Sequence, residues 1–198
     1  MRKNVGVRSE PVGRIDTKTG DDGTTGLFYG GRVSKADPRP RAYGAVDEAQ
    51  AALGMVRALG NLGPGEDQLV IDLESDLYVA MAELATLPEN RRKLVDARSR
   101  VTGNMVTALE AQIGKYYEGF AMPTEFVIPG SSPTSSLFDF ARAVVRRAER
   151  ETVALEEAGS EVVRYLNRLS DLLWTLARWH EHDAIRSRQL RDSKGEGP

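Results

Sequence analysis

The sequence has no cysteine, only two histidines and no long apolar run, and each of these features excludes a class of function. A chain of 198 residues without cysteine forms neither disulfides nor thiolate metal sites, which fits a reducing compartment. No apolar run approaches the roughly 20 residues that cross a bilayer. The N-terminus also lacks the apolar segment of a secretory signal. We therefore expect a cytoplasmic protein with no membrane partner.

An excess of charge of either sign is also missing. The 27 Lys and Arg residues nearly balance the 29 Asp and Glu residues, which gives a formal net charge of −2. A nucleic-acid-binding protein usually carries a broad basic surface, so we expect no nucleic-acid partner. The two histidines, His180 and His182, have no third ligand at helical spacing. We expect them to be exposed residues at a helix end, and we predict no metal bound directly by the protein.

Apolar residues recur with a helical period in five segments, and hydrophobic residues make up 40% of the chain. We expect helices over residues 41–60, 66–87, 96–118, 133–159 and 161–185. Ser132 is a suitable N-cap for the fourth helix and Pro133 a suitable first residue. Because no segment predicts a convincing strand, the expected fold class is all-α, an up-and-down bundle of four or five helices with ferritin-like topology. One domain is expected over 15–187, between flexible ends at 1–14 and 188–198.

The fourth predicted helix concentrates positive charge on one side. At about 100° per residue, Arg142, Arg146, Glu149 and Arg150 fall within an arc of roughly 100°, opposite an apolar stripe, and Arg147 lies off the edge of this arc. One interpretation is a solvated face with internal Arg–Glu pairs. The other is a polyphosphate site, because guanidinium groups pair bidentately with phosphate oxygens. The cluster alone leaves both interpretations open.

Residues 17–35 contain five glycines and four threonines, a density that excludes a regular helix. A flexible linker is one explanation. The run Leu27-Phe28-Tyr29 inside the segment instead suggests an anchor on the core. Glycines that let backbone N–H groups converge, with hydroxyls and lysines nearby, are typical of a phosphate-holding loop. The segment lacks the GxxxxGK[ST] pattern, so it is not a Walker A loop.

Polar residues also occur beside apolar stripes on the first and last predicted helices. Asp47 borders the apolar face of the first helix, so it is either exposed or paired with a cation. On the last helix, Asn167, Asp171, Trp174 and Arg178 share a narrow arc away from the leucine stripe. They either orient the arginines and hold a ribose or base, or form a polar face against a neighbouring subunit.

Three segments together resemble a known family: residues 17–35, residues 42–48, and the run 142–150 followed by 165–171. In this order and spacing they resemble the trimeric ATP:cob(I)alamin adenosyltransferases over about residues 15–180. The resemblance implies a five-helix bundle that assembles as a homotrimer, with ATP bound between subunits. It implies transfer of the 5′-deoxyadenosyl group of ATP to the Co(I) centre of a reduced cobalamin, with Mg²⁺ held through the ATP phosphates and triphosphate released.

The resemblance also implies roles for individual residues. Asp47 and Arg142 match an acid–arginine pair that bridges subunits and shapes the site, and Phe126 matches an aromatic residue beneath the corrin ring. Arg168 and Asp171 match supporting positions. The implied nucleotide contacts are Thr17, Lys18, Thr19, Gly20, Thr25, Gly26 and Lys35 in the arm, 15–35, and Arg146, Arg147, Glu149, Arg150 and Asn167 on the helices.

Two residue pairs depart from the family pattern. Phe138-Asp139 stands where many members have Leu-His, and Ala49-Gln50 where many have Leu-Asn, so the corrin side is expected to differ in detail. Two other functions remain open at this point. One is a carrier that binds adenosylcobalamin and passes it to a B12-dependent mutase. The other is a helical scaffold whose arginine face binds an acidic protein or RNA.

Overall fold

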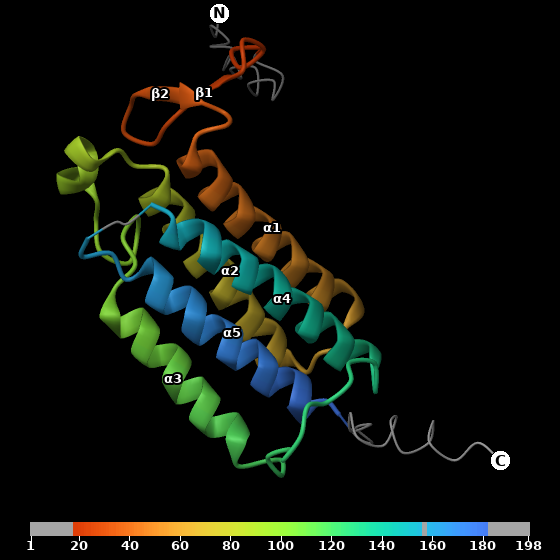
Figure 1. Ribbon diagram of the computed structural model, residues 1–198. Helices are drawn as coiled ribbons and strands as arrows, with labels where there is room; N and C mark the ends of the chain where they lie inside the picture. The colour runs from red at the N-terminus through yellow and green to blue at the C-terminus, as the bar shows by residue number, and fades with distance from the viewer. Residues whose placement is uncertain (1–17, 156–157, 182–198) are drawn as a thin grey trace, which may run out of the picture.

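The computed structural model describes residues 18–155 and 158–181, and five α-helices form its body (Figure 1). The expected flexible ends, 1–14 and 188–198, lie outside these residues. No helix among the described residues has the length and apolar character needed to cross a membrane. The helices are α1 (Pro38–Leu59), α2 (Pro64–Leu84), α3 (Gly103–Tyr117), α4 (Pro133–Val153) and α5 (Val162–Trp179).

Consecutive helices run in opposite directions, as predicted for an up-and-down bundle (Figure 1). α4 lies between α1 and α5, while α2 packs on α1 and α3 packs on α5. Contacts between helix ends fix this order: the Ser132 hydroxyl donates to the His180 carbonyl over 3.0 Å, and the Thr134 hydroxyl donates to the Gly60 carbonyl. Both bonds join the start of α4 to the end of a neighbour. The all-α bundle is therefore confirmed.

The core follows the apolar periodicity of the sequence. The leucine stripe of α5 is fully buried, and so are the small residues of α4 opposite its arginines. Burial of this much apolar surface is the main stabilising contribution to such a bundle. The fully buried positions on these two helices include Leu166, Leu169, Leu173, Leu176, Ala141, Val145 and Ala148.

Several helix boundaries differ from the predicted ones. The third helix was expected from residue 96, but α3 begins at Gly103, where the Thr102 hydroxyl caps it. The residues before it form a 3₁₀ helix, η1 (Pro88–Lys93), and a turn in which Ala97 has a φ of 57°. α4 ends at Val153, short of the expected residue 159, and α5 ends at Trp179. The Ser132 cap and the Pro133 start of α4 are confirmed.

The expectation of no strands was wrong, because the arm contains a β-hairpin. β1 (Thr24–Gly26) pairs antiparallel with β2 (Arg32–Ser34), in a register that places Thr25 opposite Val33. Each strand has three residues, too few to show the alternation by which a strand is recognised in a sequence. The hairpin is tied to the end of α2, since the Phe28 N–H donates to the Ala85 carbonyl over 3.0 Å.

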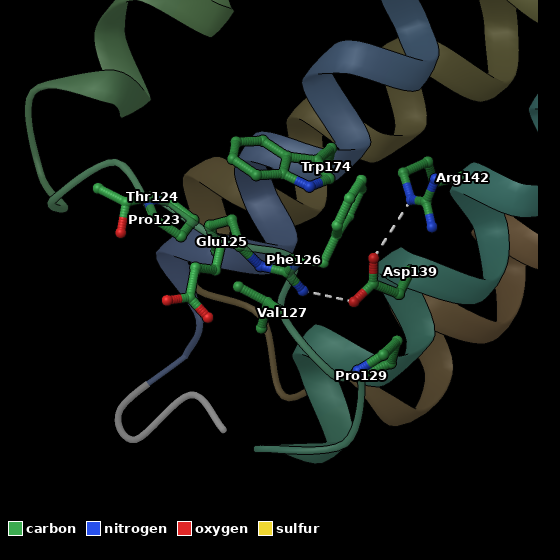
Figure 2. A pocket seen from close by; sticks show the side chains of 10 residues that line it. Pro123, Thr124, Glu125, Phe126, Val127, Pro129, Asp139, Arg142 and Trp174 are labelled. Atoms are coloured by element: carbon green, nitrogen blue, oxygen red, sulfur yellow. Dashed lines mark hydrogen bonds and ion pairs between the residues drawn. The ribbon is translucent and has the colours of Figure 1, made fainter. Parts of the chain in front are cut away.

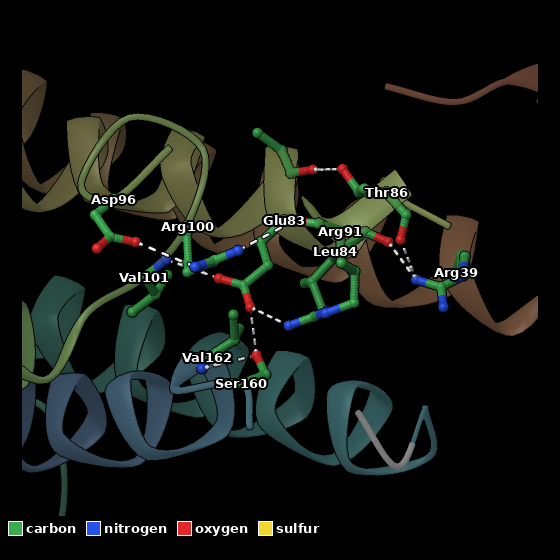
Figure 3. A network of polar contacts seen from close by, with 11 residues as sticks. Arg39, Glu83, Leu84, Thr86, Arg91, Asp96, Arg100, Val101, Ser160 and Val162 are labelled. Carbon is green, nitrogen blue, oxygen red and sulfur yellow. Dashed lines mark hydrogen bonds and ion pairs between the residues drawn. The ribbon is translucent and has the colours of Figure 1, made fainter. Parts of the chain in front are cut away.

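A buried carboxylate holds this end of the bundle together (Figure 3). Glu83, on the last turn of α2, is fully buried. Its Oε1 accepts from Arg91 and from the Ser160 hydroxyl, each over 2.8 Å, and its Oε2 accepts from the Val101 N–H over 2.7 Å. The Arg39 guanidinium donates to carbonyls of the adjacent turn. Glu83 thus joins α2, η1 and the segments that lead into α3 and α5.

Candidate active site

The arginine arc of α4 is only partly neutralised. Arg146 and Arg150 are exposed, and neither forms an ion pair with a carboxylate in the described part of the chain. Arg150 donates to the Arg146 carbonyl over 3.0 Å. Glu149 accepts instead from the Asn167 amide on α5, also over 3.0 Å. The internal Arg–Glu pairs of the solvated-face interpretation are therefore absent at these two arginines, and an Asn–Glu pair lies beside two uncompensated guanidinium groups.

Arg147 points to the other side of α4. It forms an ion pair with Glu48 on α1. The same two residues line a hollow of about 350 Å³ together with Lys35, which follows β2. Arg147 therefore contacts α1, whereas Glu149, within the arginine arc, contacts α5.

The N-terminal arm is a folded element whose shape depends on Arg32. The Arg32 guanidinium donates to the Thr19 carbonyl over 2.7 Å and to the Thr24 hydroxyl. Hydrogen bonds from the hydroxyl and the N–H of Thr24 hold the pKa of Asp22 below its ordinary value. A flexible linker is not consistent with these contacts. Thr17, one of the predicted nucleotide contacts, lies outside the described residues.

Two lysines near the glycines of the arm add to the positive charge of Arg32, which pairs with Asp22. Lys18 has a φ of 57°, and Lys35 packs its ammonium group against Gly20, where a Cβ would lie 3.0 Å from Nζ. Within the described residues neither lysine forms an ion pair. Thr25 and Gly26, the other predicted contacts, lie on β1 of the hairpin. The arm therefore carries free cationic groups and exposed backbone, as a phosphate-binding segment needs.

A pocket of about 490 Å³ opens where the segment between α3 and α4 crosses α4 and α5 (Figure 2). The Phe126 side chain stands in it with 89% of its surface exposed. An exposed aromatic ring on a pocket wall is available for contact with an apolar ligand. The residues that line the pocket are Pro123, Thr124, Glu125, Phe126, Val127, Pro129, Asp139, Arg142, Trp174 and Arg178.

The opposite wall of this pocket is ionic and buried. Asp139 is 5% exposed and accepts from Arg142 Nε over 3.2 Å through one oxygen and from Arg178 through the other. Arg178 also pairs with Glu181 over 2.7 Å and lies over the Trp174 ring at 5.5 Å. Burial raises the pKa of Glu181, and the Arg178 guanidinium opposes part of that rise. Sequence reasoning noted Asp139 only as part of a departure from the family pattern and gave it no role, although its spacing of three residues from Arg142 was a usable signal.

Asp47 and Arg142 are not brought together within one chain. Asp47 is exposed on α1 and makes no ion pair among the described residues. It lines a shallow hollow of about 290 Å³ with residues of α1 and α2 that include Glu74 and Tyr78. Of the two alternatives for Asp47, the exposed one is confirmed for the single chain. Its pairing with Arg142 stays a prediction for an assembly.

The polar side chains of α5 lie only partly where the sequence predicted them. Arg168 pairs with Asp171 and with Glu110 on α3, so these residues tie α3 to α5. Arg178 is buried, which corrects its placement on a polar surface. His180 is also not the exposed residue that was expected, because it bonds Glu66 over 2.9 Å and stacks on Phe138. His182 lies outside the described residues, among which no group of three His, Cys, Asp or Glu side chains is placed to hold a metal.

Comparisons with known proteins agree with this geometry. The family model described as cobalamin adenosyltransferase matches residues 15–180. A corrinoid adenosyltransferase of Mycobacterium bovis is 43% identical over 171 residues, which cover 83% of this chain and 87% of the relative. A corrinoid adenosyltransferase of Bacillus subtilis is 37% identical over 171 residues, or 83% of this chain and 85% of the relative.

A solved structure has the same fold. It is a variant of the PduO-type ATP:corrinoid adenosyltransferase from Lactobacillus reuteri, complexed with cobalamin and ATP. The two chains superpose with a TM-score of 0.80 and 26% identity, over 88% of this chain and 97% of the other. The match to the family model covers most of the sequence and includes the arm, the arginine helix and the pocket. The chain belongs to the cobalamin adenosyltransferase family.

Proposed function

We propose that the protein transfers the 5′-deoxyadenosyl group of ATP to the Co(I) centre of a reduced cobalamin. A bond forms between cobalt and C5′ of the ribose, and the bond from C5′ to oxygen breaks, so that triphosphate leaves with the electron pair. Family membership over residues 15–180 is the observation that carries this proposal. The two uncompensated arginines, and the pocket lined by Arg142 about one turn earlier on α4, support it, because the reaction needs a cationic site next to an apolar one.

The protein's chemical task is charge stabilisation, since the cobalt supplies the nucleophile. Negative charge grows on the triphosphate as the C5′–O bond breaks. Arg146 and Arg150 on α4, with Lys18 and Lys35 in the arm, are the free cations that would receive it. Glu149 and Asn167 would hold the nucleoside in line with the cobalt, through their own hydrogen bond across α4 and α5. Such positioning contributes several kcal/mol, on the order of what effective molarities allow.

The pocket with Phe126 is the proposed corrinoid site. A ring that covers the lower face of the corrin would keep water and an axial ligand away from cobalt, which makes Co(II) easier to reduce to Co(I). The 89% exposure of Phe126 leaves its ring available for such a contact. We further propose that Mg²⁺ binds to the triphosphate oxygens rather than to protein ligands, where it would neutralise charge on the leaving group.

The assembly is proposed to be a homotrimer with ATP between subunits. Lys35 of the arm lines one hollow with Arg147 of α4, whereas Arg146 and Arg150 do not line it. A head-to-tail contact between copies would bring the arm of one chain to the arginine arc of the next, and Asp47 to Arg142. The protein would act in the cytoplasm, where its co-substrate ATP is made, and would pass its product to a B12-dependent mutase.

Complementation between two inactive variants tests the shared site. Lys35→Ala and Arg146→Ala proteins, mixed in equal amounts and reassembled, should recover about a quarter of wild-type activity, because one interface in four then has an intact arm and an intact arginine. Each variant alone is the control. No recovery above the separate variants, in mixtures shown to exchange subunits, would place both residues in one chain's site.

The reaction itself is tested with ATP, Mg²⁺ and chemically reduced cobalamin. We expect a spectral change to a light-sensitive Co–C product, together with release of triphosphate. A carrier would bind adenosylcobalamin but show neither change. A scaffold for acidic partners would show no saturable ATP binding, and either result would overturn the proposed function.

A further inference from the structure

We propose that Asp139 is a positioning residue for the corrinoid site, and that it acts through Arg142 and Arg178. This inference rests on the proposed function, because it assigns the pocket beside Phe126 to the corrinoid. Asp139 does not need to touch the substrate in this role. It fixes two guanidinium groups that form one wall of the pocket, and through Arg178 it also fixes Trp174 (Figure 2).

The two oxygens of Asp139 are divided between the two arginines. Oδ1 accepts from Arg142 Nε over 3.2 Å, and Oδ2 accepts from Arg178 Nη2. The Asp139 side chain is 5% exposed and that of Arg178 is 3% exposed. A carboxylate so far removed from water is stable only if cations and hydrogen bonds replace its hydration. The arrangement is therefore specific to a negative charge at position 139.

Arg142 keeps most of its donors free in this arrangement. Asp139 engages only Nε, while the terminal nitrogens have no carboxylate partner in the described part of the chain, and the side chain is 30% exposed. An arginine has five N–H donors in a fixed plane, so a bond at Nε sets the direction of the other four. Asp139 thus aims Arg142 at the pocket opening, where a substrate group or a carboxylate of a neighbouring copy would be recognised.

The second contact reaches the aromatic part of the pocket. The guanidinium of Arg178 lies 5.5 Å from the centroid of the Trp174 ring, which lines the same pocket as Phe126. Arg178 Nε is buried without an acceptor among the described residues, so Asp139 and Glu181 provide the ion pairs that hold this side chain. Loss of the charge at Asp139 would leave Glu181 as the only described ion-pair partner of Arg178, and would loosen the guanidinium over the Trp174 ring.

The test is Asp139→Asn, which keeps the shape of the side chain and removes its charge. The KM for reduced cobalamin should rise about tenfold or more, as expected for loss of hydrogen bonds between charged groups. The KM for ATP should stay within about twofold of wild type, since Asp139 contacts Arg142 and Arg178 and none of the proposed nucleotide contacts. Equal KM values in variant and wild type, or an equal rise for both substrates, would overturn the proposal.

Asp76→Asn is the matched control. Asp76 is a half-buried carboxylate on α2 that accepts one hydrogen bond, from the Tyr165 hydroxyl over 3.0 Å, and it does not line the pocket. This variant should change the unfolding temperature but neither KM. If Asp139→Asn behaves in the same way, its role is structural only. If it does not fold, Asp139→Glu, which keeps the charge but displaces Arg142, should fold and show the raised KM for cobalamin with an unchanged KM for ATP.

A double-mutant cycle tests whether Asp139 acts through Arg142. The loss in kcat/KM caused by Asp139→Asn should be smaller in an Arg142→Ala background than in the wild type. Additive losses would refute the coupling. If the wild-type protein itself has no turnover with reduced cobalamin, the proposed function fails and this inference with it. Turnover in the wild type with no change in the Asp139 variant refutes only the inference.

Discussion

Replacement of Arg146 by alanine separates a catalytic from a structural role of the arginine arc. Arg146 is exposed, pairs with no carboxylate in the described part of the chain, and accepts one backbone bond from Arg150 through its carbonyl, which alanine retains. The substitution therefore removes no side-chain contact of the free protein. Its effect on the free energy of unfolding should stay within about 0.5 kcal/mol.

The effect on turnover should be much larger. Loss of one preorganised donor to a developing negative charge typically reduces kcat by about 10²- to 10³-fold, or roughly 2.7–4 kcal/mol. For Arg146→Ala we expect a decrease of this size in kcat/KM with reduced cobalamin and Mg·ATP. Arg146→Lys should recover part of it, because an ammonium group retains the charge but loses the planar fork.

The assay follows formation of the light-sensitive product and, separately, release of triphosphate. Arg164→Ala is the control, because Arg164 is also an exposed helical arginine but pairs with Glu110 and Glu161, away from the site. It should retain wild-type kcat/KM. Turnover by Arg146→Ala within about threefold of the Arg164 control would mean that the arc does not stabilise the leaving group, and the mechanism proposed above would have to be abandoned.

Four further substitutions have defined outcomes. Phe126→Ala should lower turnover from Co(II)-derived cobalamin far more than it changes the KM for ATP, and unchanged activity would exclude the proposed role of the ring. Gly119→Ala should reduce stability by about 1–3 kcal/mol in thermal unfolding, because its Cβ would overlap the Trp179 ring, whereas Gly114→Ala, which meets no atom within 4 Å, should not. Glu83→Gln should cost about 3–5 kcal/mol, or roughly 6–20 °C in unfolding temperature, since Arg91 loses its buried charge partner. Burial raises the pKa of Asp76 above its ordinary value of 3.8, so the folded state is favoured while this carboxyl is protonated. The free energy of unfolding should therefore fall as the pH rises above 3.8. Asp76→Asn should flatten this pH dependence of the free energy of unfolding, measured from about pH 4 to 6.

The helices whose apolar pattern repeats over several turns could be predicted from the sequence. The leucine stripe of α5 repeats over several turns, and its burial outweighs any local preference. The hairpin of the arm could not be predicted, because its short strands are fixed by contacts to residues far along the chain, such as the Phe28–Ala85 bond. The predicted start of the third helix was wrong for a related reason. The residues before α3 form η1 and the turn at Ala97, and these short structures have no periodic pattern in the sequence.

The candidate site was predictable where it depends on one helix and not where it depends on several. The arc of Arg146 and Arg150 follows from helical geometry alone. The Asp139 contacts need the crossing of α4 and α5, which places Arg178 beside a carboxylate 39 positions earlier. Periodicity indicates that a polar residue lies away from the core, but it does not show which other helix covers it. Buried charged residues were therefore the main omission.

Two exposed charges of the proposed site have no ion-pair partner within the described part of one chain. Arg147 is neutralised by Glu48 on the same side as Lys35, whereas Arg146 and Asp47 are left without ion-pair partners in the described residues. Exposed charges need no partner in water, so stability of the single chain does not account for where they lie. A second copy that supplies a lysine-bearing arm to the free arginine, and an arginine to the free acid, would account for both with one head-to-tail contact. Mixed assemblies of arm and helix variants therefore test the geometry of the site more directly than any single substitution.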